Sequence, residues 1–389
     1  MKESKKKEKN KHSNRKFLMI NLLMGVTIGI LIAIIRIKNE KLGIEYVKLN
    51  VWVILIVLIF YLSLCLQIIV HEAGHYLFGR LSGYTLHIFR IGSIAFVKAN
   101  DKIVVKRMKI PGTAGQCIMN PPDCKPEEIP FILYNIGGVL LNLIVSIISI
   151  ALYFIIPNVI YLSEFLMTFG VCGIFTGIMN GIPIRTKLIN NDGYNIKEML
   201  SEQTARRAFW IQLKVTAAFM NNIPLTHMPE EWFAIDTDLK ESSSLLTSLA
   251  IYNSQRFLYN MEFQKARERM HMLLEEATNM IGFQRNELMC ELFFCEMILN
   301  EDVADINKLY TKELKKFIKM TLLSLSKQRL LYSYHLLVTK DSKLMEKHST
   351  LFHKIAKKYP FQVEIDMERK LYDYVTNLSK EREMSEHIV

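Results

Sequence analysis

Long apolar runs dominate the first half of the chain, whereas the second half alternates short apolar and polar stretches. A helix needs roughly 20 mostly apolar residues to cross a membrane, and four runs meet that need: residues 17–35, 51–70, 131–156 and 161–182. From about residue 196, apolar residues recur at spacings of three and four, which is typical of amphipathic helices around a core. The pattern predicts an α-helical membrane protein with four transmembrane helices, followed by an all-α domain at residues 196–389.

The segment between the second and third apolar runs has a different pattern. Residues 84–98 and 103–109 are rich in β-branched and aromatic residues and are separated by Asn100 and Asp101, which predicts a β-hairpin. An apolar stretch broken by Gly and Pro follows. Such irregular backbone can dip into a membrane as a re-entrant loop if protein or a wet cavity covers it. The breaking residues are Pro111, Gly112, Gly115, Pro121 and Pro122.

The C-terminal half contains one segment with the pattern of a helical repeat. Residues 260–266 and the amphipathic run after them resemble a helix-turn-helix unit of the tetratricopeptide type, and further helices are expected at residues 284–298, 303–325 and 328–340. No strict repeat period recurs along this half. We therefore expect a helical-hairpin domain in which stripes of Leu, Phe and Met form the core.

Composition and charge favour a membrane protein and give it an orientation. Half of the residues are apolar and 22% are charged, which excludes a disordered or collagen-like chain. The net charge is +11, and the basic tail at residues 1–16 holds eight Lys/Arg and two Glu. Lys and Arg gather on the cytoplasmic side of membrane proteins; residues 80–130 hold eight more, residues 36–50 four and residues 157–160 none. We expect a multi-pass protein of the plasma membrane with both termini in the cytoplasm.

Other interpretations of these features have less support. A basic tail also suits nucleic acid, but no basic helix with base-reading side chains follows it, so we expect no nucleic-acid partner. The first apolar run exceeds the roughly 7–15 residues of a signal peptide and lacks a clear small-residue cleavage site, which favours a retained anchor and outer link at residues 17–50. Six cysteines without a CxxC pair or regular spacing predict neither disulfides nor a thiolate zinc site.

A metal-binding motif, HExxH, follows the second apolar run at residues 71–75. On a helix, residues four apart share one face, so His71 and His75 can reach one metal ion. Glu72 then lies beside a metal-bound water as a candidate general base. Polar groups at the end of an apolar span indicate function by default, because each is costly in a membrane. The alternative is a polar helix end that reaches the cytoplasmic face.

Catalytic zinc takes three protein ligands and keeps one position open, so the motif needs a third ligand. The positions used by soluble HExxH enzymes do not supply one: Phe78 and Leu81 stand where the extended motif has Gly and His, and the next Glu is Glu127. The next candidate is Asp192, which follows the fourth apolar run and precedes Gly193. Its carboxylate can point inward at the metal, although an Asp-Gly pair is also a common turn.

An HExxH motif in one span and Asp-Gly at the end of a later one resembles the pattern of the site-2 protease family, zinc-dependent intramembrane metalloproteases. Supporting motifs occur in the same order within residues 51–195. Gly138 and Asn142 are similar to the family's Gly-xxx-Asn motif in the intervening span. Asn180 and Pro183 are similar to its Asn-x-x-Pro segment ahead of Asp-Gly.

The stretch that contains Pro111, Gly112 and Gly115 resembles the family's membrane-embedded loop after the first core span. The chain departs from the family in the longer, more basic stretch between Pro183 and Asp192. It also has neither a PDZ-like insertion nor a CBS-like tail. The resemblance implies a three-helix catalytic core at residues 51–195, preceded by an anchor helix.

The resemblance also implies a Zn²⁺ ion held by His71, His75 and Asp192. Zinc lowers the pKa of its bound water to near 7. Glu72 would accept the proton from that water and pass it to the leaving amine. The implied reaction is the hydrolysis of peptide bonds in membrane-spanning or membrane-inserted substrates.

Two asparagines are candidates for stabilising the developing oxyanion. Asn142 and Asn180 both lie in predicted spans, and an amide donor near the metal can serve that purpose. An Asn in a span serves equally well as a hydrogen-bonding residue between helices. Both roles remain open for Asn142.

The predicted architecture indicates the class of substrate and of partner. A single-span regulatory membrane protein and a small membrane-inserted precursor peptide both suit it, and residues 196–389 suit a cytoplasmic protein partner. The hairpin at residues 84–109 could receive an unwound substrate by strand addition, or could simply cap the site. A non-catalytic membrane scaffold or immunity protein is the main alternative function, and a broken ligand set would favour it. A transporter is disfavoured because the spans show no paired Gly/Pro-broken repeats.

Overall fold

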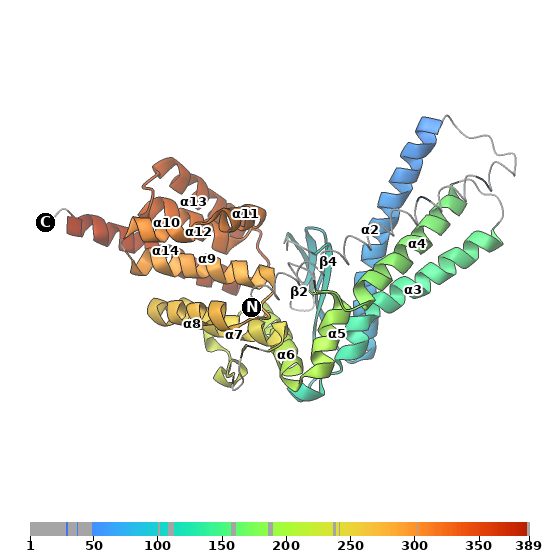
Figure 1. Ribbon diagram of the computed structural model, residues 1–389, viewed down its shortest axis with the longest axis horizontal. Helices are drawn as coiled ribbons and strands as arrows, with labels where there is room; N and C mark the ends of the chain where they lie inside the picture. Colours follow the sequence, from blue (N-terminus) through green and yellow to red (C-terminus); the bar gives the residue numbers. More distant parts are fainter. Residues whose placement is uncertain are drawn as a thin grey trace, which may run out of the picture. The chain divides into compact units, whose positions relative to one another are not determined.

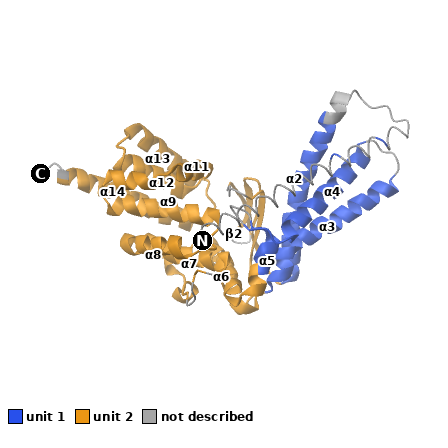
Figure 2. Cartoon of the chain, viewed as in Figure 1, with its two compact units in different colours: residues 1–82, 130–186, 190–197 blue, residues 83–129, 187–189, 198–389 orange. Residues whose placement is uncertain are grey.

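A computed structural model of the protein is mostly helical and contains one small sheet (Figure 1). The chain forms two compact units (Figure 2). The first comprises residues 1–82, 130–186 and 190–197, and the second comprises residues 83–129, 187–189 and 198–389. The structure describes residues 29, 37, 49–99, 102–107, 113–156, 161–185, 190–235, 239–240, 242–300 and 302–386. The predicted anchor helix at residues 17–35 lies, apart from Gly29, outside the described residues.

Three helices of the first unit are long and apolar enough to cross a membrane. They are α2 (Leu49–Leu81), α3 (Phe131–Ile155) and α4 (Leu162–Gly181), and each packs against the other two. They confirm the helices predicted at residues 51–70, 131–156 and 161–182. Helix α2 extends beyond its apolar run and continues through the HExxH motif to Leu81.

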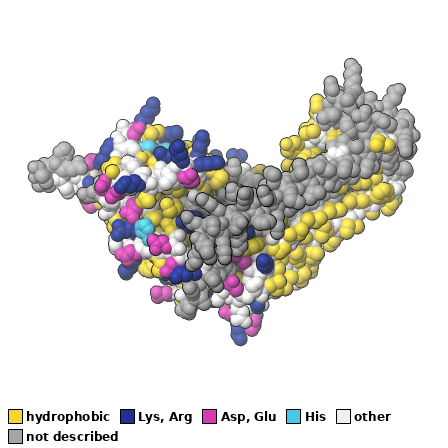
Figure 3. Space-filling view, in the orientation of Figure 1, with side chains coloured by type: hydrophobic (Ala, Val, Ile, Leu, Met, Phe, Trp, Pro, Cys, Tyr) yellow, Lys and Arg dark blue, Asp and Glu magenta, His cyan; other side chains and the backbone are white. Residues whose placement is uncertain are grey.

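The side chains of these helices are arranged with apolar groups outside and polar groups inside. Among the described residues, Ile54, Leu58, Ile147 and Phe154 are all more than half exposed. Fully buried polar residues include Ser63, Gln67, Asn142 and Ser146. On the face shown in Figure 3, the described side chains of these helices form an almost continuous hydrophobic surface. Water would disfavour such a surface, whereas lipid suits it.

Glycines allow α2 and α3 to approach each other closely. A Cβ atom built on Gly74 of α2 would lie 2.3 Å from the carbonyl oxygen of Gly137 on α3, closer than any real contact. Small residues at helix crossings are typical of membrane proteins, because they let the two backbones touch. The crossing lies one residue before His75, so it fixes the position of the histidine motif against α3.

The sheet of the second unit is antiparallel with the strand order β3-β2-β1-β4. Its strands are β1 (Thr85–Ile91), β2 (Ile94–Ala99), β3 (Lys102–Arg107) and β4 (Gly115–Asn120). Strands β2 and β3 confirm a hairpin around residues 100–101. A second tight turn at Gly92, whose φ of +58° suits glycine, divides the first predicted strand into β1 and β2.

The prediction of irregular backbone after the hairpin was wrong for residues 115–120. They form β4, which pairs with β1 and alternates between buried and partly buried side chains. The Gly and Pro residues around this segment mark the ends of a strand rather than the absence of one, since pairing with β1 satisfies its backbone groups. Gly115 is the first residue of β4, whereas Pro111 and Gly112 lie outside the described residues.

The rest of the second unit is helical, which confirms the predicted fold of the C-terminal half. Helices α6 (Gln203–Met220), α7 (Ser244–Tyr259), α8 (Phe263–Glu276) and α9 (Gly282–Leu299) each pack against the next. Helices α10 (Val303–Leu309), α11 (Lys312–Met320), α12 (Leu325–Leu337), α13 (Ser342–Ala356) and α14 (Gln362–Glu386) follow. The segment at 303–325 contains two helices because the Thr311 side chain caps α11 by accepting a hydrogen bond from the Leu314 N–H. The Leu, Phe and Met stripes are core, as in Phe293, Phe294 and Met297.

Candidate metal centre

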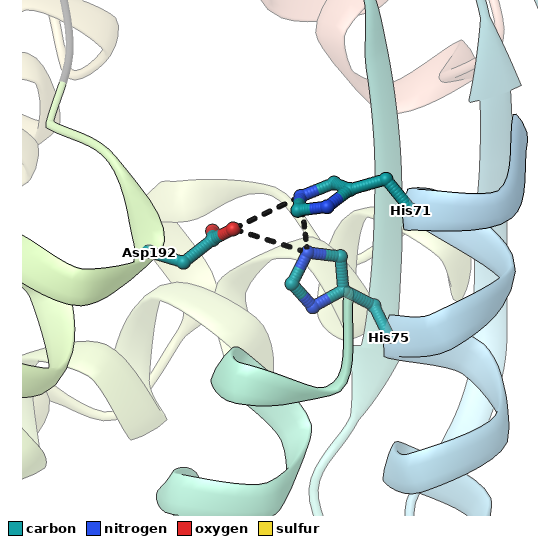
Figure 4. Close-up of side chains that lie close together, drawn as sticks. All are labelled: His71, His75 and Asp192. Atoms are coloured by element: carbon teal, nitrogen blue, oxygen red, sulfur yellow. Dashed lines mark hydrogen bonds and ion pairs between the residues drawn. The ribbon is translucent and has the colours of Figure 1, made fainter. Parts of the chain in front are cut away.

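Two imidazoles from α2 and one carboxylate from α5 (Asp192–Ser201) meet within the first unit (Figure 4). His71 and His75 lie one turn apart on α2, and Asp192 is the first residue of α5. Their side chains are 12%, 10% and 22% exposed, respectively. The structure thus brings together the three metal ligands proposed from the sequence. Such a nearly buried His-His-Asp group can hold a metal ion.

The distances between the three groups fit a single small ion. The Nε2 atom of His71 lies 3.0 Å from Oδ2 of Asp192 and 3.1 Å from Nε2 of His75, which itself lies 3.4 Å from the same oxygen. Zinc bonds nitrogen and oxygen at about 2.0–2.1 Å, so its ligands in a tetrahedral site lie roughly 3.3 Å apart. The observed triangle has nearly these edges, and it leaves a fourth position for a water or substrate atom.

The outer nitrogens of both imidazoles are occupied by acceptors. Nδ1 of His71 lies 2.8 Å from Oδ1 of Asn142, and Nδ1 of His75 lies 2.7 Å from the backbone carbonyl of Tyr134. An amide oxygen and a carbonyl only accept hydrogen bonds, so each Nδ1 carries the proton and donates it. The two Nε2 lone pairs then face each other and a carboxylate. Such lone pairs repel one another unless a cation lies between them, and metal-binding histidines typically have this arrangement.

A glycine of α3 makes room for the two imidazoles. A Cβ atom built on Gly138 would lie 2.5 Å from Cε1 of His71 and 2.7 Å from Nε2 of His75. Any larger side chain would therefore occupy the space in which the rings meet. This contact explains why the motif that contains Gly138 has glycine at this position.

The start of α5 is tied to the end of α4, and this fixes Asp192. The Asn191 side chain accepts hydrogen bonds from the Tyr194 and Ile184 N–H groups. Its amide nitrogen donates to two backbone carbonyls at the end of α4, those of Met179 and Ile182. The neighbouring Gly193 also permits close approach, since a Cβ there would lie 2.2 Å from the Gly181 carbonyl oxygen. The carboxylate of Asp192 is thus held on a fixed turn.

The remaining sequence candidates take different positions. Glu72 is 7% exposed and lies within electrostatic reach of His75. Asn142 is fully buried and donates both amide hydrogens to Gln67, to its backbone oxygen at 3.0 Å and its Oε1 at 2.6 Å. Its contacts are therefore those of a hydrogen-bonding residue between helices. Asn180 donates to the Thr176 carbonyl within α4, and the oxyanion role of both asparagines stays a prediction.

Sequence reasoning missed three parts of this centre. The Tyr134 carbonyl carries no residue-type signal at all, because every residue has one. Asn191 could have been recognised as a helix N-cap, since Asn is favoured immediately before a first helical turn. Gln67 could have been recognised by its spacing of four from His71, which places it on the same face of α2.

Comparison of the chain with known protein families, curated proteins and solved structures found no match.

Proposed function

We propose that the protein is a zinc-dependent intramembrane metalloendopeptidase with the active-site pattern of the site-2 protease family. The observation that carries the proposal is the convergence of both HExxH imidazoles with the Asp192 carboxylate. The two histidines lie on a helix that is apolar enough to span a membrane, and Asp192 begins the next helix after another such helix, α4. A non-catalytic scaffold would have no need of this ligand set or of the buried Glu72 beside it.

The donor set favours zinc among the common metal ions. Two imidazole nitrogens and one carboxylate oxygen are typical ligands of catalytic zinc sites, which keep a fourth position open. Magnesium and calcium prefer shells of oxygen ligands. When bound, zinc would supply Lewis-acid chemistry by polarising the scissile carbonyl and making a water ligand more acidic.

The side chains around the metal have separate roles in the proposed hydrolysis. Glu72 follows His71 directly in the HExxH motif and acts as the general base that takes a proton from the attacking water. It then returns this proton to the leaving amine, so that one carboxylate serves both steps. His71 and His75 would bind the metal through Nε2, while each donates its Nδ1 proton to a fixed acceptor.

The proposed substrate is a membrane-spanning or membrane-inserted segment of a regulatory protein or small precursor peptide. A helical segment hides its peptide bonds, since each carbonyl is bonded four residues along, so the substrate must unwind before attack. The distribution of Lys and Arg places both termini and the second unit on the cytoplasmic side in this proposal, with an anchor helix at residues 17–35 as a fourth span. The helical domain at 196–389 then offers a cytoplasmic surface for the substrate or for a protein partner.

The test compares Glu72→Gln with the wild-type chain on a single-span substrate in detergent or liposomes. The variant keeps the size and burial of residue 72 but removes the base, so we expect cleavage to fall by at least about 100-fold, in the range of general-base catalysis. Bound zinc should stay unchanged. Glu164→Gln is the matched control, because Glu164 is a buried acid of the same unit that belongs to no part of the proposed site. Full cleavage by Glu72→Gln would refute the enzymatic proposal.

A further inference from the structure

A fully buried glutamine lies one helical turn before the first histidine ligand. Gln67 is 0% exposed and belongs to the face of α2 that carries His71 and His75, because the three residues are spaced by four. A primary amide in an apolar span is unfavourable unless both of its ends are hydrogen-bonded. Gln67 has a partner at each end, and the two partners lie on different helices.

The two partners determine which way the Gln67 amide points. Its Nε2 donates to the backbone carbonyl of Phe169 on α4 at 2.9 Å. Its Oε1 accepts from Nδ2 of Asn142 on α3 at 2.6 Å. A carbonyl oxygen only accepts, so the amide nitrogen must face α4 and the amide oxygen must face α3.

The orientation of the Gln67 amide determines, through Asn142, which atom faces His71. Because Asn142 donates its amide hydrogens to Gln67, its Oδ1 is left to face the other way, toward Nδ1 of His71 at 2.8 Å. That oxygen accepts the Nδ1 proton, which leaves the lone pair of His71 on Nε2. This lone pair points at Asp192 and at the centre of the ligand triangle.

A glycine of α4 leaves the space through which Gln67 reaches that helix. A Cβ atom built on Gly173 would lie 2.4 Å from Nε2 of Gln67 and 2.0 Å from Oγ of Ser146. Alanine at this position would collide with the Gln67 amide and with the Ser146 hydroxyl, and it would disturb the contact of Gln67 with the Phe169 carbonyl without removing any polar group. This offers a second way to disturb the same chain of hydrogen bonds.

We propose that Gln67 is a positioning residue of the metal centre, which acts through Asn142 to hold His71 in the Nδ1-protonated form with Nε2 aimed at the metal. A backbone carbonyl of α4 thereby sets the protonation pattern of a ligand on α2 through two amides in series. This inference rests on the proposed function as far as catalysis is concerned. The geometry concerns metal binding itself, so metal affinity can test it without a substrate.

The experiment measures zinc affinity of the purified full-length chain in detergent by competition with a chelator. We expect Gln67→Leu and Gly173→Ala each to weaken zinc binding about tenfold, the lower end of the range for outer-shell partners of a ligand. The loss stays partial because the Gln67 backbone oxygen still accepts from Asn142. Ser149→Ala is the control, since it removes a buried hydrogen bond between α3 and α4, from Ser149 to the Leu166 carbonyl, that does not connect to His71. This control should leave zinc affinity unchanged.

A double-variant comparison tests whether Gln67 acts through Asn142. Asn142→Leu should weaken zinc binding by itself, and adding Gln67→Leu to it should have no further effect, because the connecting amide is already gone. The visible spectrum of the Co²⁺-substituted protein should change in Gln67→Leu and not in Ser149→Ala. Thermal unfolding of the metal-free variants shows whether each one folds.

Failure of this proposal is distinct from failure of the proposed function. Equal zinc affinity in Gln67→Leu, Gly173→Ala and Ser149→Ala would overturn the role of Gln67, and so would a full additional loss in the Asn142→Leu background. Normal zinc binding together with full cleavage by Glu72→Gln would overturn the proposed protease function. The proposed positioning role of Gln67 would still stand. A wild-type chain that binds no zinc would overturn both.

Discussion

The two units differ in the buried polar clusters that they contain. Within α2, α3 and α4, the buried polar groups include amides, hydroxyls, an imidazole and the carboxyls of Glu72 and Glu164, and many apolar side chains are exposed. The helical part of the second unit buries, besides neutral polar groups, a cluster of ion pairs. Arg329 is 0% exposed and its guanidinium binds Glu291 at 2.6 Å and Glu368 at 2.7 Å, while Lys327 binds Glu287 at 2.6 Å.

This difference indicates which buried polar cluster is suited to a metal ion. In the cluster of the second unit, which we call the Arg329 network (Arg329, Glu291, Glu368, Lys327 and Glu287), two cations pair with three carboxylates. At the metal centre, three electron-pair donors face one another, and the contacts of this group contain no Lys or Arg among the described residues. In the first cluster, the protein's own charges pair with one another. The second cluster could hold a metal ion, and the proposed function assigns one to it.

The largest expected effect concerns the third proposed metal ligand. Asp192→Ala removes one of three ligands, so zinc affinity should fall by more than the roughly 100-fold seen at most for outer-shell substitutions, and cleavage should be lost with it. Chelator competition and zinc content per chain measure the change. Asp123→Ala is the control because Asp123 is exposed and lies outside the centre. Equal zinc loss in both variants would contradict the assignment of the third ligand.

The next largest effect is expected from Arg329→Met, which tests whether the Arg329 network only stabilises the fold. Arg329→Met leaves the buried carboxylates of Glu291 and Glu368 without their guanidinium partner, and breaking a buried ion pair in this way costs about 3–5 kcal/mol of unfolding free energy. Unfolding of the full chain in detergent can be followed by Trp fluorescence, since Trp210 and Trp232 contact each other in the second unit.

Zinc affinity should not change in Arg329→Met. This result would show that the Arg329 network does not contribute to zinc binding. The control is Arg369→Met, because Arg369 and its partner Asp366 are about half exposed and such surface pairs contribute roughly 0–1 kcal/mol. A destabilisation by Arg329→Met no larger than that of Arg369→Met would contradict the structural role.

The smallest effect is a pH dependence next to the Arg329 network. Burial raises the pKa of Glu364 to about 7, the Tyr359 hydroxyl opposes this by a hydrogen bond, and the Glu368 carboxylate adds to it. Between the ordinary value of 4.5 and about 7, the unfolded chain loses this proton while the folded chain keeps it. The contribution of Glu364 to stability is therefore lost progressively as the pH rises through this window.

The substitution Glu364→Gln removes this pH dependence. The difference in unfolding free energy between the variant and the wild type should grow by about 2–3 kcal/mol in favour of Gln from pH 4.5 to 7, because the slope approaches about 1.4 kcal/mol for each pH unit inside this window. Asp366→Asn, an exposed change on the same helix, should show no such trend. Parallel pH profiles for wild type and Glu364→Gln would contradict the prediction.

The residues of the candidate metal centre could be predicted from the sequence because each has a local signature. The spacing of four in HExxH places His71 and His75 on one face of a helix whatever surrounds them. Asp192 could be proposed from its place after an apolar run, although its approach to the histidines depends on Asn191 and Gly193 at the junction of α4 and α5. The three spanning helices were predicted correctly because length and apolarity are properties of the segment itself.

The parts that could not be predicted depend on partners far away in the sequence. Strand β4 forms because β1 is available to pair with it, and its flanking Gly and Pro residues suggested irregular backbone instead. The acids of the Arg329 network lie on α9, where Glu287 and Glu291 are spaced by four, and on α14, and such acids are also typical of a solvated helix face. Their burial is decided by Arg329 and Lys327 on α12.

The most direct test of the metal centre is X-ray absorption spectroscopy of zinc in the purified wild-type chain, combined with zinc content per chain. The proposed site predicts one zinc per chain with two imidazole nitrogens and oxygen ligands at about 2.0–2.1 Å. Sulfur ligands, a single imidazole, or no bound zinc after zinc is supplied would contradict it.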